Sequence, residues 1–105
     1  MGVKRSIISY YPLALNLKDK LVVVIGGGKV SEHKIKNLLL AQAKIKLVSP
    51  VITPGLKRLV SKRKVTWVSR LARSADLRSA GLVIAATSRP LVNKSVSRWG
   101  RKRGV

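Results

Sequence analysis

The chain has 105 residues, and its 23 Lys and Arg against three Asp and Glu give a formal net charge of +20. This length supports one small domain, residues 1–105, and the 46% of hydrophobic residues, arranged in blocks, exclude a disordered basic tail. Without Cys and with a single His, the chain has no disulfide framework, no Cys nucleophile and no multi-His metal site, and we expect no bound metal.

The N-terminal segment has some, but not all, of the features of a signal peptide. Lys4-Arg5 precedes the apolar pair Ile7-Ile8, but Ser9 to Pro12 interrupts the apolar stretch and no small-residue cleavage site follows. We therefore expect no signal peptide and a cytoplasmic protein. No apolar run reaches the roughly 18 residues of a membrane span, so no membrane span is expected.

The sequence pattern predicts the first strand and the first helix most clearly. Residues 21–25 form a continuous β-branched run, which predicts a strand buried on both faces, as in a parallel sheet. The run ends at Gly26-Gly27-Gly28. Residues 30–43 then have helical spacing, with apolar positions at 30, 35, 38, 39 and 41.

The remaining elements follow in alternation. We expect strands at 45–48, 65–68 and 82–86, helices at 54–62 and 90–102, and a short connection at 71–79. Thr53 is a plausible N-cap, and Gly104 is expected to cap the last helix. The pattern predicts an α/β fold, a Rossmann-like parallel sheet with flanking helices, truncated before a fifth strand.

The glycine-rich turn carries the main functional signal. Gly26-x-Gly28-x-x-Ser31 joins the first strand to the first helix, where glycines permit a tight turn and a close approach of the backbone to a pyrophosphate. The N–H groups near Lys29 and Val30 would face the phosphates. The alternative is a turn that only packs. We predict a dinucleotide site.

The ends of the second and fourth strands complete this site. The acid that usually holds the ribose is replaced by Ser49-Pro50, so Ser49 or the backbone near Val51 and Ile52 would bind the ribose. No Arg follows directly, which favours NAD over NADP, although Lys57 and Arg58 lie within conceivable reach. Small residues at Ala86 and Thr87 would let the cofactor come close.

The charge distribution permits other partners. A charge of +20 predicts attraction to nucleic acid, an anionic membrane or a polycarboxylate. A basic cluster around Trp99 could bind a phosphate backbone, but no stacking array or nucleic-acid-binding motif appears, so nucleic acid is disfavoured as the main partner. The three acids Asp19, Glu32 and Asp76 are dispersed, which argues against a paired-carboxylate mechanism.

Several short segments in order along the chain carry a family resemblance. They are Tyr11-Pro12-Leu13-x-Leu15-Asn16-Leu17, Val23 to Val30, Val48-Ser49-Pro50 and Val83 to Thr87. Together they resemble the N-terminal part of siroheme synthase, the precorrin-2 dehydrogenase region that is often joined to sirohydrochlorin ferrochelatase activity.

The resemblance implies an oxidoreductase of siroheme (porphyrin) biosynthesis that oxidises precorrin-2, a tetrapyrrole, to sirohydrochlorin with NAD, and a homodimer in a full-length form. By position it assigns cofactor contacts to Gly26, Gly28, Lys29, Val30, Val51, Ile52, Ala86 and Thr87. The catalytic Asp of the family's downstream Asn-Val-x-Asp stretch has no counterpart here, and Ser88-Arg89 stands where the family commonly has acids. The catalytic residues are thus unknown, and a catalytically inactive NAD-binding module is the alternative.

Overall fold

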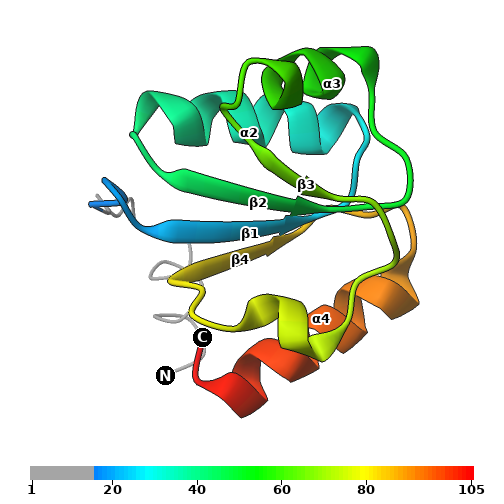
Figure 1. The fold of residues 1–105 in the computed structure, drawn as a ribbon. Helices are drawn as coiled ribbons and strands as arrows, with labels where there is room; N and C mark the ends of the chain where they lie inside the picture. Colours follow the sequence, from blue (N-terminus) through cyan, green and yellow to red (C-terminus); the bar gives the residue numbers. More distant parts are fainter. Residues whose placement is uncertain (1–15) are drawn as a thin grey trace, which may run out of the picture.

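A computed structural model describes residues 16–105, and within them strands and helices alternate (Figure 1). The Tyr11–Leu15 part of the family resemblance lies outside the described residues. The strands are β1 (Leu21–Ile25), β2 (Lys44–Val48), β3 (Thr66–Val68) and β4 (Leu82–Ala85). The helices are α2 (Lys29–Leu40), α3 (Pro54–Ser61), α4 (Pro90–Arg103) and a short 3₁₀ helix, η1 (Ser74–Leu77), in the predicted connection.

The four strands form one parallel sheet in the order β3-β2-β1-β4. The chain therefore moves outward from β1 to β3 and then returns to the other side of β1 with β4. This reversal is the topological switch point at which doubly wound sheets bind ligands. The predicted Rossmann-like parallel sheet is confirmed.

Helices cover both faces of the sheet (Figure 1). On one face, Val22 and Val24 of β1 pack with Ile35 of α2 and Leu56 of α3. On the other face, the alternate β1 residues pack with Val96 of α4. Because successive side chains of a strand point to opposite faces, the continuous apolar run of β1 supplies both cores, as predicted.

Two residues expected on the apolar face of the first helix, Val30 and Ala41, are exposed instead, as is the apolar residue Leu91 of the last helix. Val30 is 59% exposed and Leu91 79% exposed, and Ala41 is also exposed. Val30 and Leu91 lie in first helical turns that begin at the carboxyl edge of the sheet, where no strand lies beside them. Ala41 falls just after α2 and is its C-cap residue. The burial predicted from helical periodicity was therefore wrong at the ends of the helices.

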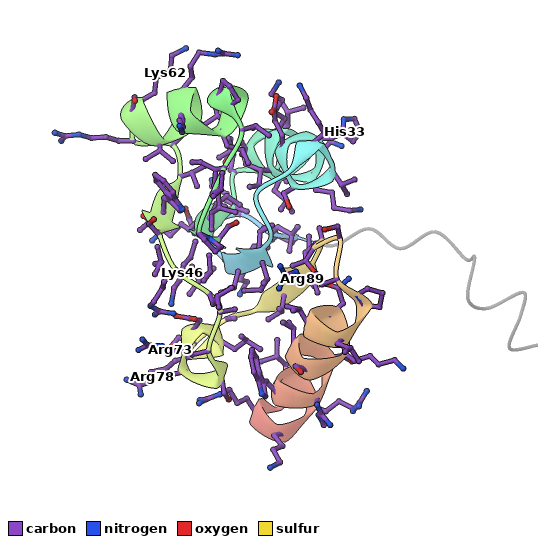
Figure 2. All side chains as sticks on the ribbon, turned by 90° about the vertical axis from the view of Figure 1, so that its right-hand side faces the viewer. His33, Lys46, Lys62, Arg73, Arg78 and Arg89 are labelled. Atoms are coloured by element: carbon purple, nitrogen blue, oxygen red, sulfur yellow. The ribbon has the colours of Figure 1, made fainter. Side chains whose placement is uncertain are left out.

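Both predicted caps are confirmed. Thr53 accepts a hydrogen bond from the Leu56 N–H at 3.1 Å, and Gly104 ends α4 with a left-handed backbone at φ 74°. Basic side chains surround the molecule, including Lys62 at the end of α3 and Arg73 and Arg78 around η1 (Figure 2). Within residues 16–105, no helix is long and apolar enough to cross a membrane.

Candidate functional site: a cavity at the strand ends

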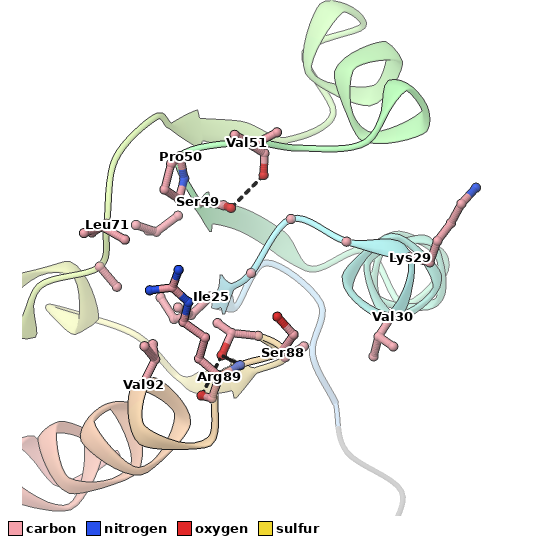
Figure 3. A pocket seen from close by; sticks show the side chains of 17 residues that line it. Ile25, Lys29, Val30, Ser49, Pro50, Val51, Leu71, Ser88, Arg89 and Val92 are labelled. Carbon is pink, nitrogen blue, oxygen red and sulfur yellow. Dashed lines mark hydrogen bonds between the residues drawn. The ribbon is translucent and has the colours of Figure 1, made fainter.

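A cavity of about 670 Å³ lies at the carboxyl ends of β1 and β4, at the switch point of the sheet (Figure 3). This volume is within the usual range of small-molecule sites. Eight of the nine predicted cofactor-binding residues line it: Gly26, Gly28, Lys29, Val30, Ser49, Val51, Ala86 and Thr87. Ile52 does not line it, because its side chain is 4% exposed and belongs to the core beneath α2 and α3.

Each glycine of the turn has its own structural requirement. Gly26 has φ 121°, and a Cβ there would lie 2.7 Å from the Ala86 carbonyl oxygen. A Cβ on Gly27 would overlap the Val51 carbonyl oxygen. A Cβ on Gly28 would meet no atom of residues 16–105 within 4 Å. The protein fold therefore requires the first two glycines, whereas Gly28 leaves open space beside the cavity.

The start of α2 presents backbone donors beside this open space. The N-cap residue Gly28 has no side chain, and the first N–H groups of a helix lack intrahelical partners. These groups and the helix dipole favour an anion. Ser31, the small third position of the motif, is fully buried, which allows α2 to pack closely on the sheet.

The loop after β2 is fixed to the glycine turn by hydrogen bonds. The Thr53 N–H donates to the Gly27 carbonyl at 3.0 Å, and the Ser49 hydroxyl donates to the Val51 carbonyl at 2.7 Å. The Trp67 indole N–H donates to the Ser49 carbonyl at 2.8 Å. The Ser49 hydroxyl proton is thus used within the loop, and its oxygen can accept from a ribose hydroxyl.

Asn93 holds the loop after β4 by hydrogen bonds, a role that was not predicted from the sequence. The Thr87 hydroxyl donates to Asn93 Oδ1 at 2.6 Å, and Asn93 Nδ2 donates to the Thr87 carbonyl at 3.1 Å. The Arg89 N–H donates to Thr87 Oγ1 at 3.2 Å. The Thr87 hydroxyl therefore shapes the loop in this structure. The sequence does contain a signal for this role of Asn93. It lies one turn into the last helix and six residues after the Thr at the end of the fourth strand.

Thr53 links α3 to α2 through the one acid near the glycine turn. Its hydroxyl donates to Glu32 Oε1 at 2.6 Å, and Lys36 Nζ lies 3.1 Å from Glu32 Oε2. The Thr53 hydroxyl, then Lys36, lower the pKa of the Glu32 carboxyl below its ordinary value. Glu32 is consequently occupied in helix packing and does not line the cavity.

We expect Thr53→Ala to lower the free energy of unfolding by about 1 kcal/mol, because the α3 cap is lost and Glu32 loses a donor. Thr53→Ser retains the hydroxyl and should lose much less. Urea unfolding at pH 7 measures both. Equal losses in the two variants would contradict the role of the hydroxyl.

No carboxylate among the described residues lines the cavity. Asp76 is buried in η1, Glu32 packs against α3, and Asp19 precedes β1 at the opposite end of the strands. Among residues 16–105, no three His, Cys, Asp or Glu side chains gather as metal ligands do. The cavity can therefore hold a dinucleotide through backbone N–H groups, hydroxyls and cations, and it supplies no acidic group for proton transfer.

Comparisons with known proteins agree with this geometry. Residues 13–105 match the NAD_binding_7 family, described as "Putative NAD(P)-binding". A siroheme synthase from Baumannia cicadellinicola subsp. Homalodisca coagulata is 38% identical over 93% of this chain and 21% of its own length. The precorrin-2 dehydrogenase of Bacillus subtilis is 35% identical over 82% of this chain and 53% of its own length.

A solved structure, titled "SirC, precorrin-2 dehydrogenase", superposes with a TM-score of 0.79 at 29% identity. The match covers 83% of this chain and 44% of that one. The resemblance inferred from the sequence motifs is thereby confirmed. The chain spans about a fifth to about half of the length of these relatives.

Proposed function

This chain belongs to the NAD_binding_7 family of NAD(P)-binding domains, and from that premise we propose that it forms, as a single domain of residues 1–105, the NAD site of a precorrin-2 dehydrogenase. The reaction proposed is the oxidation of precorrin-2 to sirohydrochlorin, in which the nicotinamide ring of NAD accepts a hydride. We also propose that the protein is located in the cytoplasm.

The observation that carries the proposal is the open space at Gly28. Gly26 and Gly27 are required by the fold itself, whereas among the described residues Gly28 has no neighbour that would exclude a side chain. A glycine with no packing role, beside unpaired helix N–H groups and a cavity, is expected where a pyrophosphate approaches the backbone. The residues present therefore fit the cofactor, with Gly28, Lys29 and Val30 at the pyrophosphate.

The substrate is proposed to be a tetrapyrrole, and the functional assembly a homodimer. The net charge of +20 favours association with a polycarboxylate such as precorrin-2. Two relatives named as precorrin-2 dehydrogenases support the substrate class. We assign no catalytic residue, because within residues 16–105 no carboxylate or His lines the cavity.

A cavity lining without a carboxylate favours one alternative, an NAD-binding module without catalysis. Nucleic-acid binding is less well supported. Arg98, Arg101, Lys102 and Arg103 are exposed on α4, but Trp99 packs into the core between α4 and the sheet. The indole N–H of Trp67 donates a hydrogen bond to the Ser49 carbonyl, and its ring packs against the core beneath α2 and α3. Neither ring is displayed for stacking on a base.

Titration of the chain with NAD, followed by tryptophan fluorescence, is expected to give saturable binding, because Trp67 is bonded to the β2 loop at the cavity. Duplex DNA at equal ionic strength should give weaker, salt-sensitive binding. Absence of NAD binding would contradict the proposal. Dehydrogenation assayed on the same chain with precorrin-2 then separates an active enzyme from an NAD-binding module.

A further inference from the structure

The cavity contains one cationic side chain that points inward. Lys29 and Arg89 are the charged residues of its lining. Figure 3 shows the Arg89 side chain extending into the cavity beside Ile25, whereas the Lys29 side chain points away from it. Lys57 and Arg58, the cations considered from the sequence, lie on α3 outside the lining.

The position of Arg89 is set by its backbone. Its N–H donates to Thr87 Oγ1 at 3.2 Å, and its carbonyl accepts from the Asn93 N–H at 3.1 Å, so the loop after β4 holds the residue in place. Arg89 precedes α4, yet its side chain does not cap the helix. The guanidinium, which extends into the cavity in Figure 3, therefore has no function in the α4 cap.

No anion of the chain neutralises this guanidinium. Within residues 16–105 the ion pairs are Lys36–Glu32, Lys46–Asp76 and Arg70–Asp76, and Arg89 makes none. All three acids of the chain lie in this range, and none lines the cavity. A cation in a concave site without a protein counterion attracts an anionic ligand, and Arg binds phosphate oxygens with paired donors.

We propose that Arg89 is the anion-binding side chain of this cavity and holds a phosphate of the bound dinucleotide. This inference rests on the proposed NAD site. The phosphate is either in the pyrophosphate, which NAD and NADP share, or the 2′-phosphate, which only NADP carries. With no carboxylate at the end of β2 to repel a 2′-phosphate, both sources are compatible with the lining.

Calorimetric titration of the full chain with NAD and with NADP tests the inference. Arg89→Gln is expected to weaken binding about tenfold or more, the loss typical of a charge-assisted hydrogen bond. Equal weakening for both ligands identifies the pyrophosphate, and weakening for NADP alone identifies the 2′-phosphate. The matched control is Arg98→Gln, an equal change of charge at an exposed α4 position outside the lining.

Affinities of Arg89→Gln that equal those of Arg98→Gln for both ligands would overturn the inference and leave the proposed site intact. Absence of binding by the unsubstituted chain would instead overturn the proposed function. Circular dichroism checks that each variant is folded. If Arg89→Gln is unfolded, Arg89→Lys tests the same contact, because it keeps the charge but loses the paired donors, and unchanged affinity would overturn the inference.

Discussion

Gly27→Ala is expected to lower the free energy of unfolding by about 3 kcal/mol, the upper end of the cost of overpacking. The new methyl group would overlap the Val51 carbonyl and lie 2.8 Å from both Ile52 Cγ2 and the Ser49 hydroxyl. The carbonyl is backbone, so relief requires the β2 loop to move away from the glycine turn. That movement would also break the Thr53–Gly27 hydrogen bond. Thermal and urea unfolding measure the loss.

Gly28→Ala, one residue further on, is the matched comparison. Its methyl group meets no atom within 4 Å in the part of the chain that the structure describes, so its unfolding midpoint should stay close to that of the unsubstituted protein. Its affinity for NAD should fall at least tenfold, because the methyl group occupies the space through which a pyrophosphate approaches the backbone. Full NAD affinity in a folded Gly28→Ala chain would contradict the assignment of the pyrophosphate to this turn.

The parts of the fold that follow from local chemistry were predictable from the sequence. The bounds of β1 follow from a β-branched run that ends at glycine. Thr53 before Pro54 predicted the start of α3, and Gly104 predicted the end of α4. The alternation of strands and helices predicts a parallel sheet whose strand ends meet at one edge. This is why eight residues from three segments of the sequence meet at one cavity.

The features that the sequence did not reveal depend on the direction of side chains in three dimensions. Ile52 follows β2 as Val51 does, but its side chain points into the core while Val51 lines the cavity. The exposure of Val30 and Leu91 depends on where each helix starts relative to the sheet. The position of the Arg89 backbone depends on the loop that the Thr87–Asn93 hydrogen bonds hold, and periodicity carries no information on these bonds.

Asp76 shows how this highly basic chain uses one of its few acids. Its carboxylate is 2% exposed and accepts two hydrogen bonds from Arg70, at 2.7 and 2.8 Å, and one from the Arg73 N–H at 2.7 Å. Lys46 Nζ on β2 lies 3.4 Å away. The Arg70 guanidinium, more than the other donors, lowers the pKa of Asp76 to about 2, despite the opposing effect of burial. This carboxylate therefore attaches η1 to the sheet.

Asp76→Asn should lower the free energy of unfolding by about 3 kcal/mol at pH 7, because it leaves Arg70 and Lys46 facing a neutral group in a partly buried cluster. The pKa of Asp76 is depressed in the folded state, so its charge stabilises the fold above about pH 4. That contribution, about 2 kcal/mol, is lost as the pH falls through about 2. Urea unfolding of both proteins between pH 7 and pH 2 should give a difference that narrows below pH 4.

The control for this series is Asp19→Asn, since Asp19 is exposed, makes no ion pair within residues 16–105 and has a positive φ that Asn tolerates. Its stability should match that of the unsubstituted chain throughout the pH range. An Asp76→Asn chain as stable as this control at pH 7 would show that the cluster does not hold η1. A difference that stays constant down to pH 2 would show that the carboxylate charge is not what stabilises η1, and that the loss arises from the amide NH2 group, a donor that replaces one of the two acceptor oxygens.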